Sequence, residues 1–297
     1  MQSRHAYPPR FRNAQLGSWQ HAAPSVGAMN DTASINHAAA MNDTTTETGQ
    51  RVMLPSLRRW NIVMALLHLA QAAVMIALTK ARSLPVTAVY GTGPPGQPER
   101  AAEITTLFSY NLGWAVASFM LLSSLFHAVV ASPWGYLRYC TEIRNLRNRF
   151  RWAEYSLSAS LMIVLIAGIV GITDVAALIA LFAVNASMIL FGWLMETGSR
   201  PGRDAIWTPF IFGCLAGIAP WAAITVYLFG TDGVPGFVYG IFVSLFIFFN
   251  CFAINQWLQY RAKGRWADYR YGERVYMILS VVAKSLLAWQ IFTNVLI

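Results

Sequence analysis

Two formally charged side chains lie well inside the long apolar stretches of this sequence, and together they suit chemistry with an aldehyde. If the last stretch begins near Tyr276, Lys284 lies roughly 12–14 Å along it, close to the middle of a bilayer core about 30 Å thick. A buried primary amine is either paired with a carboxylate or neutral, and the neutral amine is a nucleophile that forms Schiff bases. A protonated Schiff base needs an anion, and Glu154 is the one acidic candidate within the apolar stretches.

The same residues also have structural explanations. A Lys–Glu pair inside a membrane can stabilise helix packing or form part of an ion path. His68 and His127 also fall in apolar stretches, where histidines more often hydrogen-bond as packing residues than act as ligands. Two histidines without a third donor make a weak metal site, so we expect no metal.

The composition predicts what must position these residues. Of the 297 residues, 56% are hydrophobic and 12% charged, whereas soluble domains carry about 25% charged residues. The three cysteines, Cys140, Cys214 and Cys251, are an odd number and form no CxxC pair, which argues against a zinc ribbon or a disulfide-bonded secreted domain. The chain is therefore expected to be an all-α, multi-pass membrane protein.

Seven apolar stretches are each close to the roughly 20 residues that cross a bilayer as a helix. An odd number of helices places the two termini on opposite sides of the membrane, and the third and fourth stretches are separated by little more than a turn. The stretches cover residues 60–79, 105–131, 152–173, 175–195, 206–229, 236–260 and 275–296.

The distribution of charge predicts the orientation of the bundle. With the N-terminus inside, the four inner segments (51–59, 132–151, 196–204 and 261–274) carry +3, +4, zero and +3, while the outer segments sum to −1. Positive charge concentrates in cytoplasmic loops, so we expect a cell-membrane protein with a cytoplasmic N-terminus and an extracellular C-terminus. The net charge of +9 is explained by these blocks, and nucleic-acid binding has no support.

Three further expectations concern the parts around the helices. Residues 1–50 are polar and predicted to be a disordered tail, which leaves residues 51–297 as the membrane domain. Residues 85–98 alternate briefly and then turn on Gly and Pro, so a small β-hairpin is plausible in the first extracellular loop. Glu154 follows Arg151 too closely to reach the depth of Lys284, and we therefore expect the third helix to start near residue 145, with part of the 144–151 basic block buried.

Three strings in the right order on the right helices resemble the heliorhodopsins, a family of retinal-binding seven-helix proteins of inverted topology. They are RWAEYSLSAS at 151–160, FNCFAINQ at 249–256 followed by YRYGER at 269–274, and SVVAKSLLAWQ at 280–290. The resemblance covers about residues 55–297.

The resemblance implies a rhodopsin-like bundle that binds all-trans retinal on Lys284 as a protonated Schiff base, with Glu154 as its counterion. It implies a polar cluster on the cytoplasmic side that receives or shares the Schiff-base proton. It also implies large apolar walls around the polyene and ring. The residues so implied are Ser280 and Ser158 beside the Schiff base, Ser123, His68 and His127 in the cluster, and Tyr155, Met188, Trp221, Phe249 and Gln256 along the chromophore.

Two departures from the pump rhodopsins favour light sensing over transport. Ser280 stands where pumps have an aspartate, and Leu165 stands where proton pumps have a carboxyl donor. The expected protein is therefore a slow-cycling photoreceptor, not an enzyme, that forms a homodimer and signals to a cytoplasmic or enzyme partner, with the loop 261–274 as one candidate output surface. A light-gated or light-driven proton or ion transporter is the alternative, and a transporter without retinal stays open as an outsider.

Overall fold

A computed structural model describes residues 54–91, 94, 102–230 and 232–296. The expected tail at 1–50 lies outside the described residues. The element order is α2 (Pro55–Leu78), β1 (Ser83–Gly91), β2 (Ala102–Asn111), α3 (Leu112–Ala131), α4 (Pro133–Arg144), α5 (Arg149–Ile169), α6 (Val175–Gly198), α7 (Thr208–Gly230), α8 (Gly236–Arg261), a short 3₁₀ turn (Gly264–Ala267) and α9 (Tyr269–Ile291), which ends in a π-helical turn (Phe292–Leu296).

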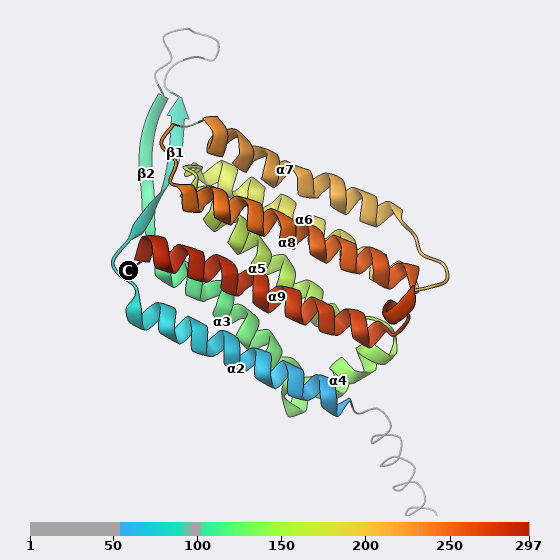
Figure 1. The fold of residues 1–297 in the computed structure, drawn as a ribbon. Helices are drawn as coiled ribbons and strands as arrows, with labels where there is room; N and C mark the ends of the chain where they lie inside the picture. Colours follow the sequence, from blue (N-terminus) through green and yellow to red (C-terminus); the bar gives the residue numbers. More distant parts are fainter. Residues whose placement is uncertain (1–53, 92–93, 95–101, 231, 297) are drawn as a thin grey trace, which may run out of the picture. The chain divides into compact units, whose positions relative to one another are not determined.

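Seven of the described helices, all except the short α4, are long and apolar enough to cross a membrane. They form the single bundle of Figure 1, and the seven-helix prediction is confirmed. Large apolar side chains such as Leu215 (59% exposed) and Val226 (68%) cover the outside, whereas Lys284, Glu154 and Arg151 are buried. This is the reverse of a soluble bundle and suits a lipid environment.

The third membrane helix does not start near residue 145, as expected, but at Arg149. Leu146 has a left-handed backbone with φ of 57°, which ends the preceding helical segment. The Asn148 side chain then accepts a hydrogen bond from the Arg151 backbone N–H at 3.1 Å, a cap that starts α5. The second half of that expectation holds, because Arg151 is only 6% exposed.

The connection between α2 and α3 contains two antiparallel strands that extend well beyond the predicted 85–98. They pair from Ser83 opposite Asn111 to Gly91 opposite Ala102, with an irregularity at Val86 and Thr87. The Thr87 backbone N–H donates to the Thr173 carbonyl at 2.9 Å, so β1 is attached to the turn between α5 and α6. We call this end of the bundle the hairpin end, and the opposite end the α4 end.

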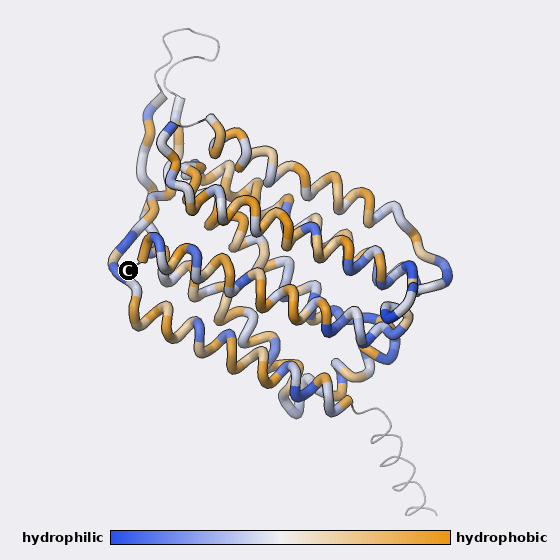
Figure 2. Tube along the Cα trace, in the orientation of Figure 1, coloured by the Kyte–Doolittle hydropathy of each residue, from blue (hydrophilic) through white to orange (hydrophobic). Residues whose placement is uncertain are grey.

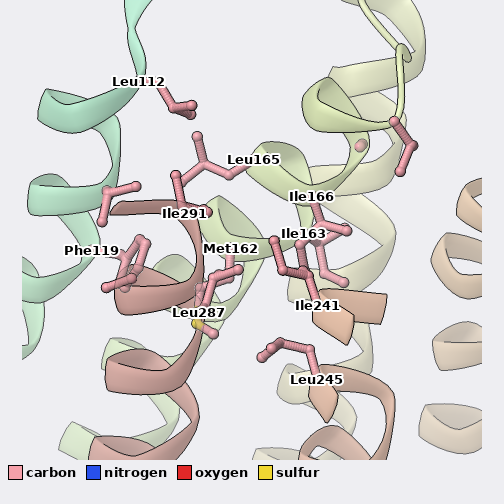
Figure 3. Close-up of a cluster of buried hydrophobic side chains, with 14 of the residues drawn as sticks. Leu112, Phe119, Met162, Ile163, Leu165, Ile166, Ile241, Leu245, Leu287 and Ile291 are labelled. Carbon is pink, nitrogen blue, oxygen red and sulfur yellow. The ribbon is translucent and has the colours of Figure 1, made fainter. Parts of the chain in front are cut away.

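The two ends differ in chemistry. Figure 3 shows part of the core near the hairpin end, where Phe119, Met162, Ile241 and Ile291 pack together from α3, α5, α8 and α9. Figure 2 shows hydrophilic residues gathered at the α4 end, along the turns that join α4 to α5 and α8 to α9. Among the buried side chains described, every Lys, Arg, His and Glu lies level with Lys284 or nearer the α4 end.

Candidate functional site

Lys284 and Glu154 form a buried ion pair across the centre of the bundle. The Lys284 Nζ donates to the Glu154 Oε1 at 2.7 Å, and both residues are 3% exposed. The same ammonium donates to the Ser280 Oγ at 2.8 Å, one turn earlier on α9. The predicted partnership of these three residues is therefore present in the geometry.

The different starting levels of α5 and α9 explain how the pair meets. Both helices begin at the α4 end, but Glu154 lies roughly 8 Å along α5 whereas Lys284 lies roughly 22 Å along α9. The start of α9 must therefore extend beyond the start of α5, and the first turn of α5 lies inside the protein. This is why Glu154 appears too shallow when depth is counted from the sequence.

The predicted polar cluster surrounds the far side of Glu154. The Ser123 hydroxyl donates to the Glu154 Oε1 at 2.6 Å. The rings of His68 and His127 stack with centroids 5.9 Å apart, and the His127 Nδ1 lies 2.8 Å from the Asn61 Oδ1. Neither imidazole has a hydrogen bond to Glu154 among the contacts described, and the His68 Nε2 has no protein partner. Among the described residues, no group of three or more His, Cys, Asp or Glu could hold a metal ion.

An apolar cavity opens from the other side of Lys284. It encloses about 840 Å³, counting its open mouth, between α5, α6, α7, α8 and α9. Besides Lys284, six predicted residues line it: Ser280, Ser158, Tyr155, Met188, Phe249 and Gln256. Trp221 is not among the lining residues, because its ring packs edge-on against Phe249 at 5.4 Å and lies behind it.

The residues of this cavity fit an elongated hydrocarbon that carries an aldehyde. Aromatic and aliphatic side chains form most of the wall, and Lys284 places a primary amine at one end. The Ser158 hydroxyl is fully buried and has no hydrogen-bond partner among the described residues, and so remains open to a polar atom of a ligand. A cavity of this kind, mostly apolar with a few polar groups, is typical of a small-molecule site.

Comparison with known proteins agrees with this chemistry. The family model for heliorhodopsin matches residues 57–296. The chain belongs to the heliorhodopsin family. Heliorhodopsins are retinal-based, light-sensing, multi-pass membrane proteins and are not a known enzyme family. A comparison with curated proteins finds no match.

This heliorhodopsin also has a second buried ion cluster, which hydropathy did not reveal. Arg151 donates to Glu196 at 2.7 Å and to Glu273, and all three side chains are at most 4% exposed. The apolar stretches predict Glu196 and Glu273 in inner loops, but α6 continues to Gly198 and α9 already begins at Tyr269. The expectation that Lys284 and Glu154 are the only charges within the spans is therefore wrong. The sequence does contain a signal for this cluster. Glu196 and Glu273 each lie within two residues of an apolar stretch, and the basic block at 144–151 offers them a partner.

A smaller cavity, which we call the polar cavity for its ionisable lining residues, is bordered by both ion clusters. Its volume is about 380 Å³, counting its open mouth, and its lining includes Glu154 and His127 together with Arg151 and Glu273. Tyr155 and Tyr276 line both this cavity and the apolar one. Tyr139 of α4 also lines the polar cavity, and burial raises the pKa of its hydroxyl to about 12, so it stays protonated and can donate.

Proposed function

We propose that this chain is a light sensor in which Lys284 carries all-trans retinal as a protonated Schiff base and Glu154 is the counterion. The observation that supports this most strongly is the position of the Lys284–Glu154 pair at the end of the apolar cavity. When bound, retinal supplies light absorption and isomerisation. The protein supplies the amine, a fixed negative charge within 2.7 Å of it, and walls that limit how the polyene moves.

The small number of lysines in the chain allows a direct test of the linkage. The chain has three lysines, Lys80, Lys263 and Lys284. After addition of all-trans retinal to membranes, we expect a visible absorption band for the wild type and for Lys263→Ala, and none for Lys284→Ala. Borohydride reduction followed by peptide mass spectrometry should place the retinyl group on the peptide with Lys284. A coloured Lys284→Ala protein, or a label on another lysine, would refute the linkage.

We further propose that Ser123, His68 and His127 receive or share the proton that leaves the Schiff base during a slow photocycle. Support comes from the direct hydrogen bond of Ser123 to Glu154 and from the two stacked imidazoles, of which His127 contacts the Asn61 side chain. Replacement of both histidines by phenylalanine should change the rise and decay of the photocycle by several-fold while the dark absorption band is kept. Flash photolysis would measure this, and unchanged kinetics would remove the histidines from the proposal.

The distribution of buried ionisable side chains between the two halves of the bundle favours sensing over ion pumping. Transport needs groups on both sides of the Schiff base that take and return a proton, and the buried ionisable side chains described all lie at or on the α4 side of Lys284, apart from Tyr110 near the hairpin end. Illuminated cells should therefore show no pH change that a protonophore abolishes. A protonophore-sensitive change would favour the alternative, a light-driven or light-gated proton carrier.

The proposed sensor works as a homodimer with its N-terminus in the cytoplasm and signals through the α4 end to a partner protein. The concentration of positive charge at that end supports the orientation. The candidate output surface is smaller than the predicted loop 261–274, because Tyr269 and Glu273 are buried in α9. Pull-down in light and dark would test for the partner, and crosslinking in membranes would test the dimer.

A further inference from the structure

Trp152 belongs to both the apolar cavity and the second ion cluster. Its ring is part of the cavity wall, and its indole Nε1 donates to the Glu196 Oε2 at 2.7 Å. The residue is 5% exposed and lies in the first turn of α5, two positions before Glu154. It is the one cavity-lining side chain with a described hydrogen bond to this cluster.

Glu196, near the end of α6, connects the beginnings of α5 and α9 at the α4 end. Besides Trp152, its carboxylate accepts from Arg151 and from the Tyr269 hydroxyl, each at 2.7 Å, and from the Asn148 backbone N–H at 2.8 Å. Hydrogen bonds to a buried carboxylate are strong and mutually dependent. A shift of the Trp152 indole would therefore alter the hydrogen bonds of Glu196 to Asn148 in the α4–α5 turn and to Tyr269 at the start of α9.

The Trp152 ring has little room to move without disturbing this cluster. A Cβ atom on Gly192 of α6 would lie 2.5 Å from two atoms of the ring, so the ring occupies the space that the glycine leaves. The Arg151 guanidinium carbon lies 4.5 Å from the centre of the Trp152 ring. Pressure on the ring from the cavity must accordingly shift Arg151, Glu196 or the backbone of α6.

We infer that Trp152 relays a change of ligand shape in the apolar cavity to the Arg151–Glu196–Glu273 cluster, and through it to the α4–α5 turn and the start of α9. This inference rests on the proposed function, since it needs a retinal that changes shape in light. It assigns Trp152 a positioning role, coupled to the output end through a single hydrogen bond to Glu196.

Light-minus-dark infrared spectroscopy of the full chain, reconstituted with all-trans retinal, tests the relay. The variants are Glu196→Gln, Trp152→Phe and the control Trp289→Phe. Trp289 also donates its indole N–H to a side-chain oxygen, that of Gln71 at 3.2 Å, but lines neither cavity. We expect the wild type to show a carboxylate band that Glu196→Gln removes. Per amount of pigment bleached, Trp152→Phe should reduce this band at least two-fold and Trp289→Phe should leave it intact.

Each outcome decides a different point. A Glu196 band at full strength in Trp152→Phe overturns the relay, as does a wild type that bleaches without any band sensitive to Glu196→Gln. If Trp152→Phe forms no pigment, wild-type protein grown with indole-¹⁵N tryptophan replaces it. A light-induced N–H band that shifts with the isotope and disappears in Glu196→Gln supports the relay, and the lack of such a band contradicts it. Absence of pigment in the wild type would instead refute the proposed function.

Discussion

Glu154 accepts hydrogen bonds from Lys284 and Ser123 through one oxygen, so Glu154→Gln removes its charge while nearly keeping its shape. Loss of the negative charge should red-shift the absorption band or convert the pigment to the neutral, near-ultraviolet form, because a protonated Schiff base is stabilised by a nearby anion. Absorption spectra across a pH series would measure this. Glu142→Gln is the control, since Glu142 pairs with the exposed Arg149 and lines neither cavity. A spectrum and titration like those of the wild type would remove Glu154 as counterion.

Gly192 is where the smallest change should have a large effect on the cavity. An added methyl group would overlap the Trp152 ring, and overpacking of this kind costs about 1–3 kcal/mol. Gly192→Ala should therefore lower the thermal bleaching temperature and shift the absorption band. Gly240→Ala, in the interior of α8 with its nearest neighbour 3.8 Å away, should be neutral or slightly stabilising because alanine favours helix. Equal behaviour of the two variants would contradict this account of the cavity wall.

At the scale of elements, Asn148 sets where α5 begins. Its side chain caps the helix and its Nδ2 donates to the Glu273 Oε2 at 2.7 Å. Asn148→Ala should cost about 1 kcal/mol for the cap and about 1–3 kcal/mol for the bond lost at the Glu273 Oε2, while Arg151 still pairs with the Oε1. Asn111→Ala is the matched control, because the Asn111 side chain caps α3 and its one hydrogen bond within the described residues is to the Trp114 backbone N–H at 3.1 Å. Thermal denaturation should rank Asn148→Ala clearly below Asn111→Ala, and a reversed order would show that Glu273 finds another donor.

The helices themselves could be predicted from sequence, because runs of about 20 apolar residues have few alternatives in a bilayer. Their ends could not. The start of α5 depends on the left-handed Leu146 and on Asn148, and hydropathy does not register either. The end of α6 and the start of α9, where Glu196 and Glu273 lie, differ from the prediction for the same reason. A window average treats Glu196 and Glu273 as water-exposed, whereas Arg151, Trp152 and Tyr269 compensate them inside the protein.

The Lys284–Glu154 pair could be found from sequence because unpaired charges in a membrane are costly, so the two charges seen there implied each other. Trp221 shows the limit of this reasoning. Its position on α7 suits a cavity wall, but Phe242, Phe246 and Phe249 surround its ring edge-on at 5.3–5.6 Å. Which of several aromatic residues faces a cavity depends on helix rotation, and a sequence without strong polar and apolar faces does not specify that rotation.

Across the whole molecule, packing in the hairpin half should affect stability without affecting colour. Ile291 is fully buried in the apolar core near the hairpin end, about 10 Å along α9 from Lys284. Truncation of buried isoleucine costs about 2–5 kcal/mol in soluble proteins. Helix contacts in a bilayer rely on packing more than on exclusion of water, so we expect Ile291→Ala near the lower limit. The variant should denature at a lower temperature but absorb at the wild-type wavelength.

Ser280→Ala should have the opposite pattern to Ile291→Ala, with the colour changed and the stability nearly kept. Ser280→Ala removes a hydroxyl that lies 2.8 Å from the Lys284 Nζ, so it should shift the absorption band while changing the denaturation temperature by only a few degrees. Val226→Ala, on the lipid-facing side of α7 at 68% exposure, should change neither quantity. A colour shift in Ile291→Ala would mean that packing in the hairpin half reaches the chromophore. The apolar core near the hairpin end would then help to set the geometry of the chromophore.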